Sequence, residues 1–234
     1  ALLRRSASDA PAGVVWALAG GFTPAELQLV LAAYAGHPPD APALSVGAPS
    51  SEQAGRARLS DVLVQLLVGG SRLGTTEQLL DTAEAIASFA PCDCRAGLEF
   101  WTIFAERISR LSASNQLEAD QMVRTFRVCA AWKQRCGAAL AATRIGPWGH
   151  MLRSVGGRLA DPRHLDSLSL PDVVVAARCA ARLDEPQLRF AAAVGLRVGS
   201  REAAESLSAE DLVDLIGAAG RLGGRLHMMT RALA

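Results

Sequence analysis

The sequence predicts an all-α fold, an α-solenoid of two-helix repeats of about 38 residues that becomes irregular in the middle. Three observations predict this fold. The composition is rich in helix formers, capping residues stand at several expected helix starts, and one segment in the last third of the chain is repeated without a gap.

The composition favours helices over strands. Half of the 234 residues are hydrophobic, yet only 5% are aromatic, so a core must be built mainly from Ala, Leu and Val. Small aliphatic side chains suit closely packed helices, whereas strands favour β-branched and aromatic residues. The β-branched run at 173–175 lies inside a longer helical pattern.

The chain is expected to have three parts. Residues 1–35 form an N-terminal helical segment, and residues 36–57, which hold four prolines with Gly and Ser, form a loop or linker. Residues 58–234 form the helical repeat array. Apolar periodicity after the loop predicts helices over 59–73, 76–90, 95–111, 117–142, 147–159, 171–183, 185–198, 209–222 and 225–233.

Capping boxes mark several of the expected helix starts. In this motif a Ser or Thr accepts a hydrogen bond from the backbone N–H three residues later, and the side chain of that residue reaches back. Four pairs fit the pattern or its Asp variant: Thr23 with Glu26, Thr75 with Gln78, Ser169 with Asp172, and Ser208 with Asp211. An Arg-Leu pair is expected at helix ends, beginning at Arg72, Arg110, Arg158, Arg182 and Arg221.

The repeat is clearest in the last third of the chain. Residues 168–184 (LSLPDVVVAARCAARLD) align without a gap with residues 207–223 (LSAEDLVDLIGAAGRLG). The two capping serines are 39 residues apart, and a second helix fits between the two segments. Units that cannot bury an apolar face alone are expected to stack on their neighbours. The alternative is an ordinary irregular helical domain in which the similarity arose by chance.

These two segments resemble the heptatricopeptide and octotricopeptide class of helical repeats, which begin Leu-Ser-x-x-Asp-Leu and end Ala-x-x-Arg-Leu-Gly. The resemblance is weaker at 59–74 and 22–35 and poor over 95–142, so it covers about half of the chain. It implies an organellar protein that acts on RNA, and some members of the class are subunits of mitochondrial ribosomes. The RNA-binding domain that often ends such proteins is not visible here.

The arrangement of charge suggests where RNA would bind. The formal net charge is only +1, but no acidic residue lies between Asp120 and Asp161, and this window holds seven basic residues. On a helical wheel Arg124, Arg127 and Arg135 share one face, opposite an apolar face. A basic stripe beside an aromatic is typical of nucleic-acid contact. The predicted RNA-binding residues are Arg124, Arg127, Arg135, Arg144, Trp148, Arg153 and Arg158.

Other interpretations of these residues stay open. The arginines could instead pair with acids of other helices or be solvated, and Trp148 and Trp132 could be core residues. Lys133, the sole lysine, falls toward the apolar side of its helix and could extend its ammonium group past it or contact a partner. The excess of Arg over Lys fits either a GC-rich coding bias or phosphate recognition.

The motif search predicts a protein that is not an enzyme. The sequence has no G-x-x-x-x-G-K-[ST], no H-E-x-x-H and no G-x-S-x-G motif. Its five cysteines do not have the spacing of a disulfide framework, so we expect a reducing compartment and cysteines that mostly fill the core. The four histidines are scattered, and neither a metal nor any other cofactor is expected.

The expected function is that of a non-catalytic scaffold that contacts ribosomal RNA and neighbouring proteins as a structural subunit of a mitochondrial ribosome. The first eight residues, ALLRRSAS, have the composition of a transit peptide or its remnant, although a trimmed chain would look the same. A matrix location follows, without membrane insertion and without a small-molecule substrate. The alternatives are a protein-binding scaffold in a respiratory or ATP synthase assembly, and a free RNA-processing factor.

Overall fold

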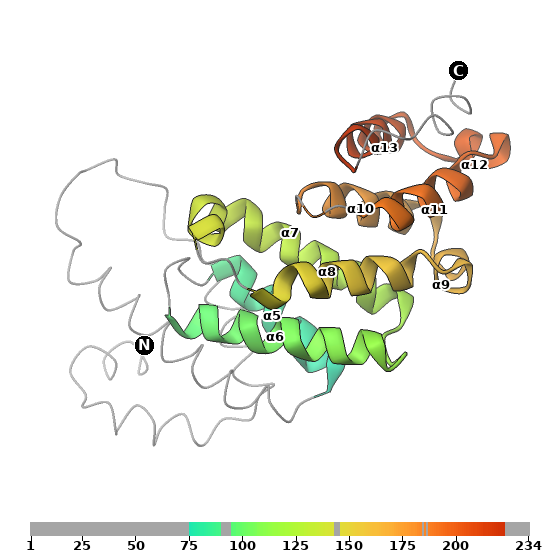
Figure 1. Ribbon diagram of the computed structural model, residues 1–234. Helices are drawn as coiled ribbons and strands as arrows, with labels where there is room; N and C mark the ends of the chain where they lie inside the picture. The colour runs from blue at the N-terminus through green and yellow to red at the C-terminus, as the bar shows by residue number, and fades with distance from the viewer. Residues whose placement is uncertain (1–74, 90–94, 143–145, 184, 186, 223–234) are drawn as a thin grey trace, which may run out of the picture. The chain divides into compact units, whose positions relative to one another are not determined.

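The fold is all-helical. A computed structural model of the chain describes residues 75–89, 95–142, 146–183, 185 and 187–222, and this part contains helices and no strand (Figure 1). In chain order the helices are α5 (Thr76–Phe89), α6 (Arg95–Ala113), α7 (Ala119–Ala142), α8 (Gly146–Leu159), α9 (Pro162–Ser167), α10 (Leu170–Ala181), α11 (Leu188–Val198), α12 (Arg201–Ser206) and α13 (Ala209–Arg221).

The chain divides into two compact units, residues 1–103 and residues 104–234. In the described part of the first unit, α5 buries one face through Leu79, Leu80 and Ile86. At the start of α6, the rings of Phe100 and Trp101 meet edge to face with centroids 5.3 Å apart. The boundaries expected after residues 35 and 57 lie outside the described residues, as do the helices expected over 59–73 and 225–233.

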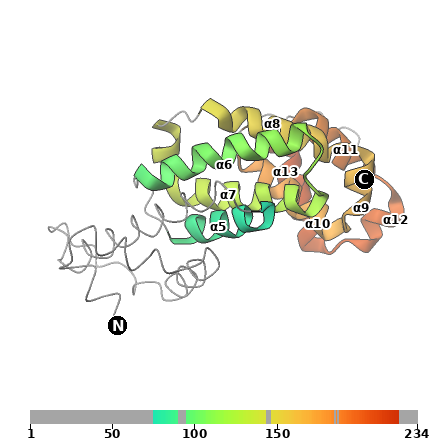
Figure 2. The same ribbon diagram turned by 90° about the horizontal axis from the view of Figure 1, so that it is seen from below.

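In the second unit α10 packs extensively against both α7 and α13, while α8 and α9 pack against α11 (Figures 1 and 2). The core is aliphatic with a few aromatic rings, as the composition predicted. Phe126 of α7 and Phe190 of α11 are both fully buried, and their ring centroids are 5.7 Å apart.

The predicted capping boxes form where the structure describes them. Gln78 donates its backbone N–H to Thr75 Oγ1 at 3.3 Å, and Gln78 Oε1 accepts from the Thr75 backbone at 3.0 Å. The Asp variant differs, because its shorter side chain accepts from the capping hydroxyl. Ser208 Oγ accepts from the Asp211 backbone at 3.1 Å and donates to Asp211 Oδ2 at 2.7 Å. The pair at Thr23 lies outside the described residues.

The two aligned segments form equivalent helices that pack against each other. Ser169 caps α10 and Ser208 caps α13 with nearly the same backbone geometry, φ −68° for both and ψ of 154° and 158°. Both helices end at the predicted Arg-Leu pair, with the C-cap at Arg182 for α10 and at Leu222 for α13. The sequence therefore located two matching helices correctly.

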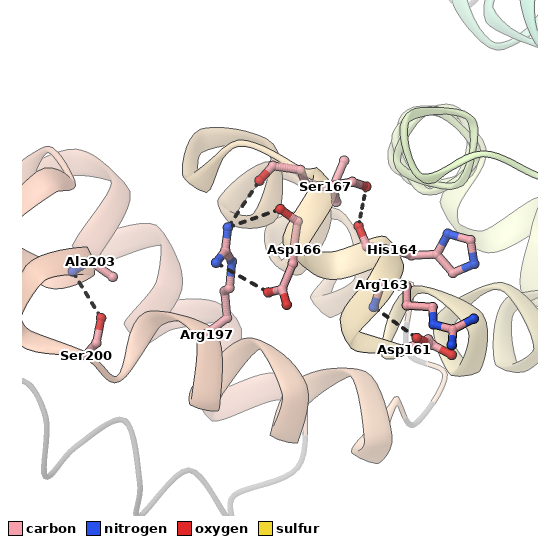
Figure 3. A network of polar contacts seen from close by, with 9 residues as sticks. Asp161, Arg163, His164, Asp166, Ser167, Arg197, Ser200 and Ala203 are labelled. Carbon is pink, nitrogen blue, oxygen red and sulfur yellow. Dashed lines mark hydrogen bonds and ion pairs between the residues drawn. The ribbon is translucent and has the colours of Figure 1, made fainter.

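Two short helices lie between the expected ones. α9 begins with Asp161 as its N-cap, which accepts from the Arg163 backbone N–H at 3.0 Å, followed by Pro162 at the first helical position. At the other end of α9, Arg197 of α11 pairs with Asp166 at 3.3 Å, and its guanidinium also reaches two carbonyl oxygens that end the helix (Figure 3). α9 therefore depends on contacts from outside itself.

The paired glycines at 156 and 157 lie in the last turn of α8, which ends at Leu159. A Cβ on Gly156 would come within 1.9 Å of Gln187 Oε1 and 2.9 Å of Gln187 Cδ, whereas a Cβ on Gly157 would meet nothing within 4 Å. Gln187 is buried, so its side chain must leave its place to admit a methyl group. Gly156 therefore permits a close approach between α8 and the start of α11.

We expect Gly157→Ala to raise the free energy of unfolding by about 0.5–1 kcal/mol, because alanine is the better helix former. Gly156→Ala should lower it by about 1 kcal/mol, since overpacking outweighs the same gain in propensity. Urea unfolding of the two variants measures the difference, and each variant is the control for the other. Equal stabilisation by both would show that Gln187 moves aside without cost.

The cysteines are only partly as expected. Cys129 and Cys179 are free and buried, as core residues should be. Cys136, in contrast, is buried and disulfide-bonded. The sequence analysis expected cysteines that mostly fill the core, and it gave no sign of this disulfide, because spacing along the chain does not fix which cysteines meet in space.

None of the described helices is long and apolar enough to cross a membrane.

Candidate nucleic-acid interface

α7 has the two-faced character that the sequence predicted. The residues expected on its apolar face are buried where they are described: Met122, Phe126, Cys129 and Cys136. On the opposite face Arg127 and Arg135 are exposed, and Arg124 is half-buried one turn before Arg127. Partial burial lowers the pKa of Arg135, although arginine remains charged at physiological pH. The helix thus presents guanidinium groups over about three turns.

α10 adds two arginines to this surface. Burial raises the pKa of the Cys179 thiol, and the charges of Arg178, Arg182 and Arg127 oppose that rise. Such an effect requires all three guanidinium groups to lie near the same sulfur atom. Arg127 of α7 and the two arginines at the end of α10 thus surround the same region, where α7 packs against α10. We call Arg127, Arg178 and Arg182 the α7–α10 arginine cluster.

Contacts between α7 and α10 hold part of the cluster in place. Lys133 Nζ donates to the backbone oxygen of Arg182 at 2.8 Å, and Arg182 Nη1 donates to Gln134 Oε1 at 3.4 Å. A cation at a helix C-terminus is favourable, because the last carbonyl groups carry partial negative charge. Lys133, expected to extend past the apolar face or contact a partner, thus ties its helix to the end of α10.

One member of the cluster has an acidic partner. Arg178 Nη1 pairs with Asp214 Oδ2 of α13 at 2.6 Å, while its Nε is buried without a hydrogen bond. This ion pair uses part of the fork-shaped donor set of the guanidinium. Arg127 and Arg182 are exposed, so they are the members best placed to meet a ligand.

The α8 arginines have partners within the chain. Arg153 forms an ion pair and hydrogen bond with Glu185, yet its side chain remains 60% exposed. Arg158 is half-buried, with its Nη2 3.2 Å from His164 Nε2. These contacts match the alternative that arginines of this window pair inside the protein. Arg144 lies outside the described residues.

Trp148 is not placed to stack on a base. Its side chain is buried, with 8% exposure, and its ring centroid lies 5.2 Å from that of Trp132. The two rings join α7 to α8 inside the second unit. The assignment of Trp148 as an RNA-binding residue is therefore corrected in favour of the alternative, a core residue. The sequence misled here because a Trp after a Gly-Pro turn looks like a loop residue, whereas Gly146 begins α8.

The sequence analysis missed Arg178 and Arg182 as companions of Arg127. Arg182 was identified only as part of an Arg-Leu helix end, and Arg178 was not singled out. Their role depends on α10 packing on α7, which no local pattern of the sequence specifies. The acid-free window between Asp120 and Asp161 therefore identified only the α7 side of this surface.

Among the described residues no group of three or more His, Cys, Asp or Glu side chains could hold a metal ion. Comparisons with protein-family models, curated proteins and solved structures found no match to the chain.

Proposed function

We propose that the protein is a non-catalytic helical scaffold that contacts RNA through the α7–α10 arginine cluster, as a structural subunit of a mitochondrial ribosome. The cluster supports the RNA contact, because it gathers guanidinium groups from two helices at a partly exposed surface. The resemblance of the repeated segments to organellar heptatricopeptide and octotricopeptide repeats supports the ribosomal setting. The α-solenoid architecture is part of the same proposal, supported by the matching pair α10 and α13.

The main support for the RNA contact is the exposure of Arg127 and Arg182 on two helices that pack together. Arginine offers a planar donor set that matches phosphate, and two exposed guanidinium groups on neighbouring helices favour a polyanion. The ion pair with Asp214 holds Arg178 in place, so the ligand would contact mainly Arg127 and Arg182. Contacts of this kind position a phosphate backbone and do not read base sequence.

The test uses the full chain and a fluorescently labelled ribosomal RNA fragment, with binding measured by anisotropy at several salt concentrations. We expect the double variant Arg127→Glu/Arg182→Glu to weaken binding by at least about tenfold. It should also reduce the slope of log K against log salt by about 2, because each of the two arginines neutralises about one phosphate. Both residues are exposed, so the variant should keep its fold, which circular dichroism would verify.

Arg189→Glu is the matched control, because it places the same charge change at an exposed position on α11, outside the cluster. A nonspecific effect of net charge would weaken binding equally in the control and in each single variant. That outcome, or RNA binding untouched by the double variant, would refute the cluster as the RNA contact.

The second candidate is a protein-binding scaffold in another organellar complex. The ion pairs of Arg153, Arg178 and Arg197 favour it, since they show arginines used within the protein. Gradient sedimentation of the native complex with and without RNase separates the two. A particle that shifts after RNase supports the ribosomal proposal, and a particle indifferent to RNase supports the protein scaffold.

A further inference from the structure

α13 has an apolar face that the described helices leave exposed. Leu215, Ala218 and Leu222 are buried along the side of α13 that meets α10. On the opposite side Val213 is 69% exposed and Ile216 is 54% exposed. Gly217 and Gly220 continue this exposed side by one further turn. We call Val213, Ile216, Gly217 and Gly220 the outer face of α13; it contains no charged residue.

The two glycines have no packing role in the described part of the chain. A Cβ at Gly217 or at Gly220 would meet nothing within 4 Å, unlike a Cβ at Gly156. Glycine inside a helix is less favourable than any residue except proline. Exposed glycines within a helix allow another backbone or a large side chain to approach closely from outside.

The order of residues along the outer face is self-complementary. Two large side chains, Val213 and Ile216, are followed by Gly217 and Gly220. If a second α13 runs antiparallel about a two-fold axis, each Val213 lies across from Gly220 of the other copy, and Ile216, close to the axis, lies across from Ile216 of the other copy. Val213 then fills the space above a glycine, and the two isoleucines meet at the axis, so both copies use the same patch.

The charges at the ends of α13 fit the same arrangement. Glu210 and Arg221 are exposed near the two ends of the helix and flank the outer face on the same side. A two-fold axis through the middle of the face brings Glu210 of one copy beside Arg221 of the other. A parallel two-fold arrangement would instead place Glu210 and Arg221 of the two copies at opposite ends and on opposite flanks, so that they could not pair.

We propose that the outer face of α13 is a docking site for a second copy of this chain, paired antiparallel with Val213 over Gly220 and Ile216 against Ile216 of the other copy. The interface of one short helix is small, so the dimer should be weak and concentration-dependent. This proposal is independent of the RNA contact, because it involves a different face of a different helix.

The experiment is sedimentation equilibrium of the full chain from about 1 to 200 µM, a range that brackets weak dimers. We expect a monomer–dimer equilibrium that Ile216→Glu weakens at least tenfold. Gly217→Ala/Gly220→Ala should raise the melting temperature by about 2 °C per substitution, because alanine is the better helix former, and yet weaken the dimer. Leu196→Ala, at an exposed position of α11, is the control that should leave the equilibrium unchanged.

A charge exchange tests the orientation. Glu210→Arg should weaken the dimer, and Glu210→Arg/Arg221→Glu should restore it, because the pair then forms with reversed polarity. A chain that is monomeric throughout the range, or a dimer that Ile216→Glu leaves intact, would overturn the proposal.

Discussion

Replacing Phe126 by alanine lowers the free energy of unfolding by about 3–5 kcal/mol, the usual cost of removing a buried phenyl ring. Phe126 is fully buried in α7, and its ring meets Phe190 of α11. The ring also lies 3.5 Å from the position that a Cβ on Gly156 would take. The change therefore opens a cavity where α7, α8 and α11 meet. Urea denaturation followed by circular dichroism measures the loss.

The matched control is Leu196→Ala, which removes a side chain that is 68% exposed and should change stability by less than about 0.5 kcal/mol. Phe126→Leu should fall between the two, because it restores part of the lost volume. A Phe126→Ala variant as stable as the control would mean that this part of the second unit is not closely packed in solution.

Raising the pH above about 9 should destabilise the protein through its buried thiols. Burial raises the pKa of Cys129 far above its ordinary value of 9.0, and the neighbouring Cys179 raises it further. Burial raises the pKa of Cys179 as well, against the opposing arginine charges. A thiol whose pKa is raised in the folded state contributes stability fully below its unfolded pKa. That contribution is lost as the pH rises through the interval between the unfolded and folded pKa values, because only the unfolded chain then releases the proton.

The expected slope is about 1.4 kcal/mol per pH unit for each thiol that ionises only on unfolding. Urea unfolding at intervals from pH 7 to 10, in reducing buffer throughout, measures it. The variant Cys129→Ala/Cys179→Ala is the reference, since it keeps every other titrating group. The difference in stability between the two proteins should be constant up to about pH 8.5 and then change in favour of the variant. A constant difference up to pH 10 would contradict the burial of these thiols.

The sequence predicted local structure well where it depends on contacts between residues that are close together in the chain. Thr75 and Gln78 form the predicted capping box, and Ser169 and Ser208 begin matching helices. These contacts join residues three apart, so they depend on little beyond the chain nearby. The short helix α9 could have been predicted in the same way, because Asp161 followed by Pro162 is a strong N-terminal signal.

The candidate site was predicted less completely, because it depends on which helices meet. The helical wheel correctly placed Arg127 and Arg135 on the outer side of α7. No local pattern could show that α10 brings Arg178 and Arg182 to the same place, or that Trp132 covers Trp148. Pairing of Arg153 with Glu185 joins residues 32 apart, which likewise requires the tertiary structure.

The position of Lys133 has a practical consequence for chemical labelling. It is the only lysine of the sequence, and its ammonium donates to the carbonyl of Arg182 at the end of α10. Apart from the amino terminus, an amine-specific acylating reagent therefore has one target, located where α7 meets α10. Acylation removes the positive charge from that contact and leaves a mass tag on a single peptide. The extent of modification at Lys133 thus gives mass spectrometry a one-site report on whether the two helices are joined.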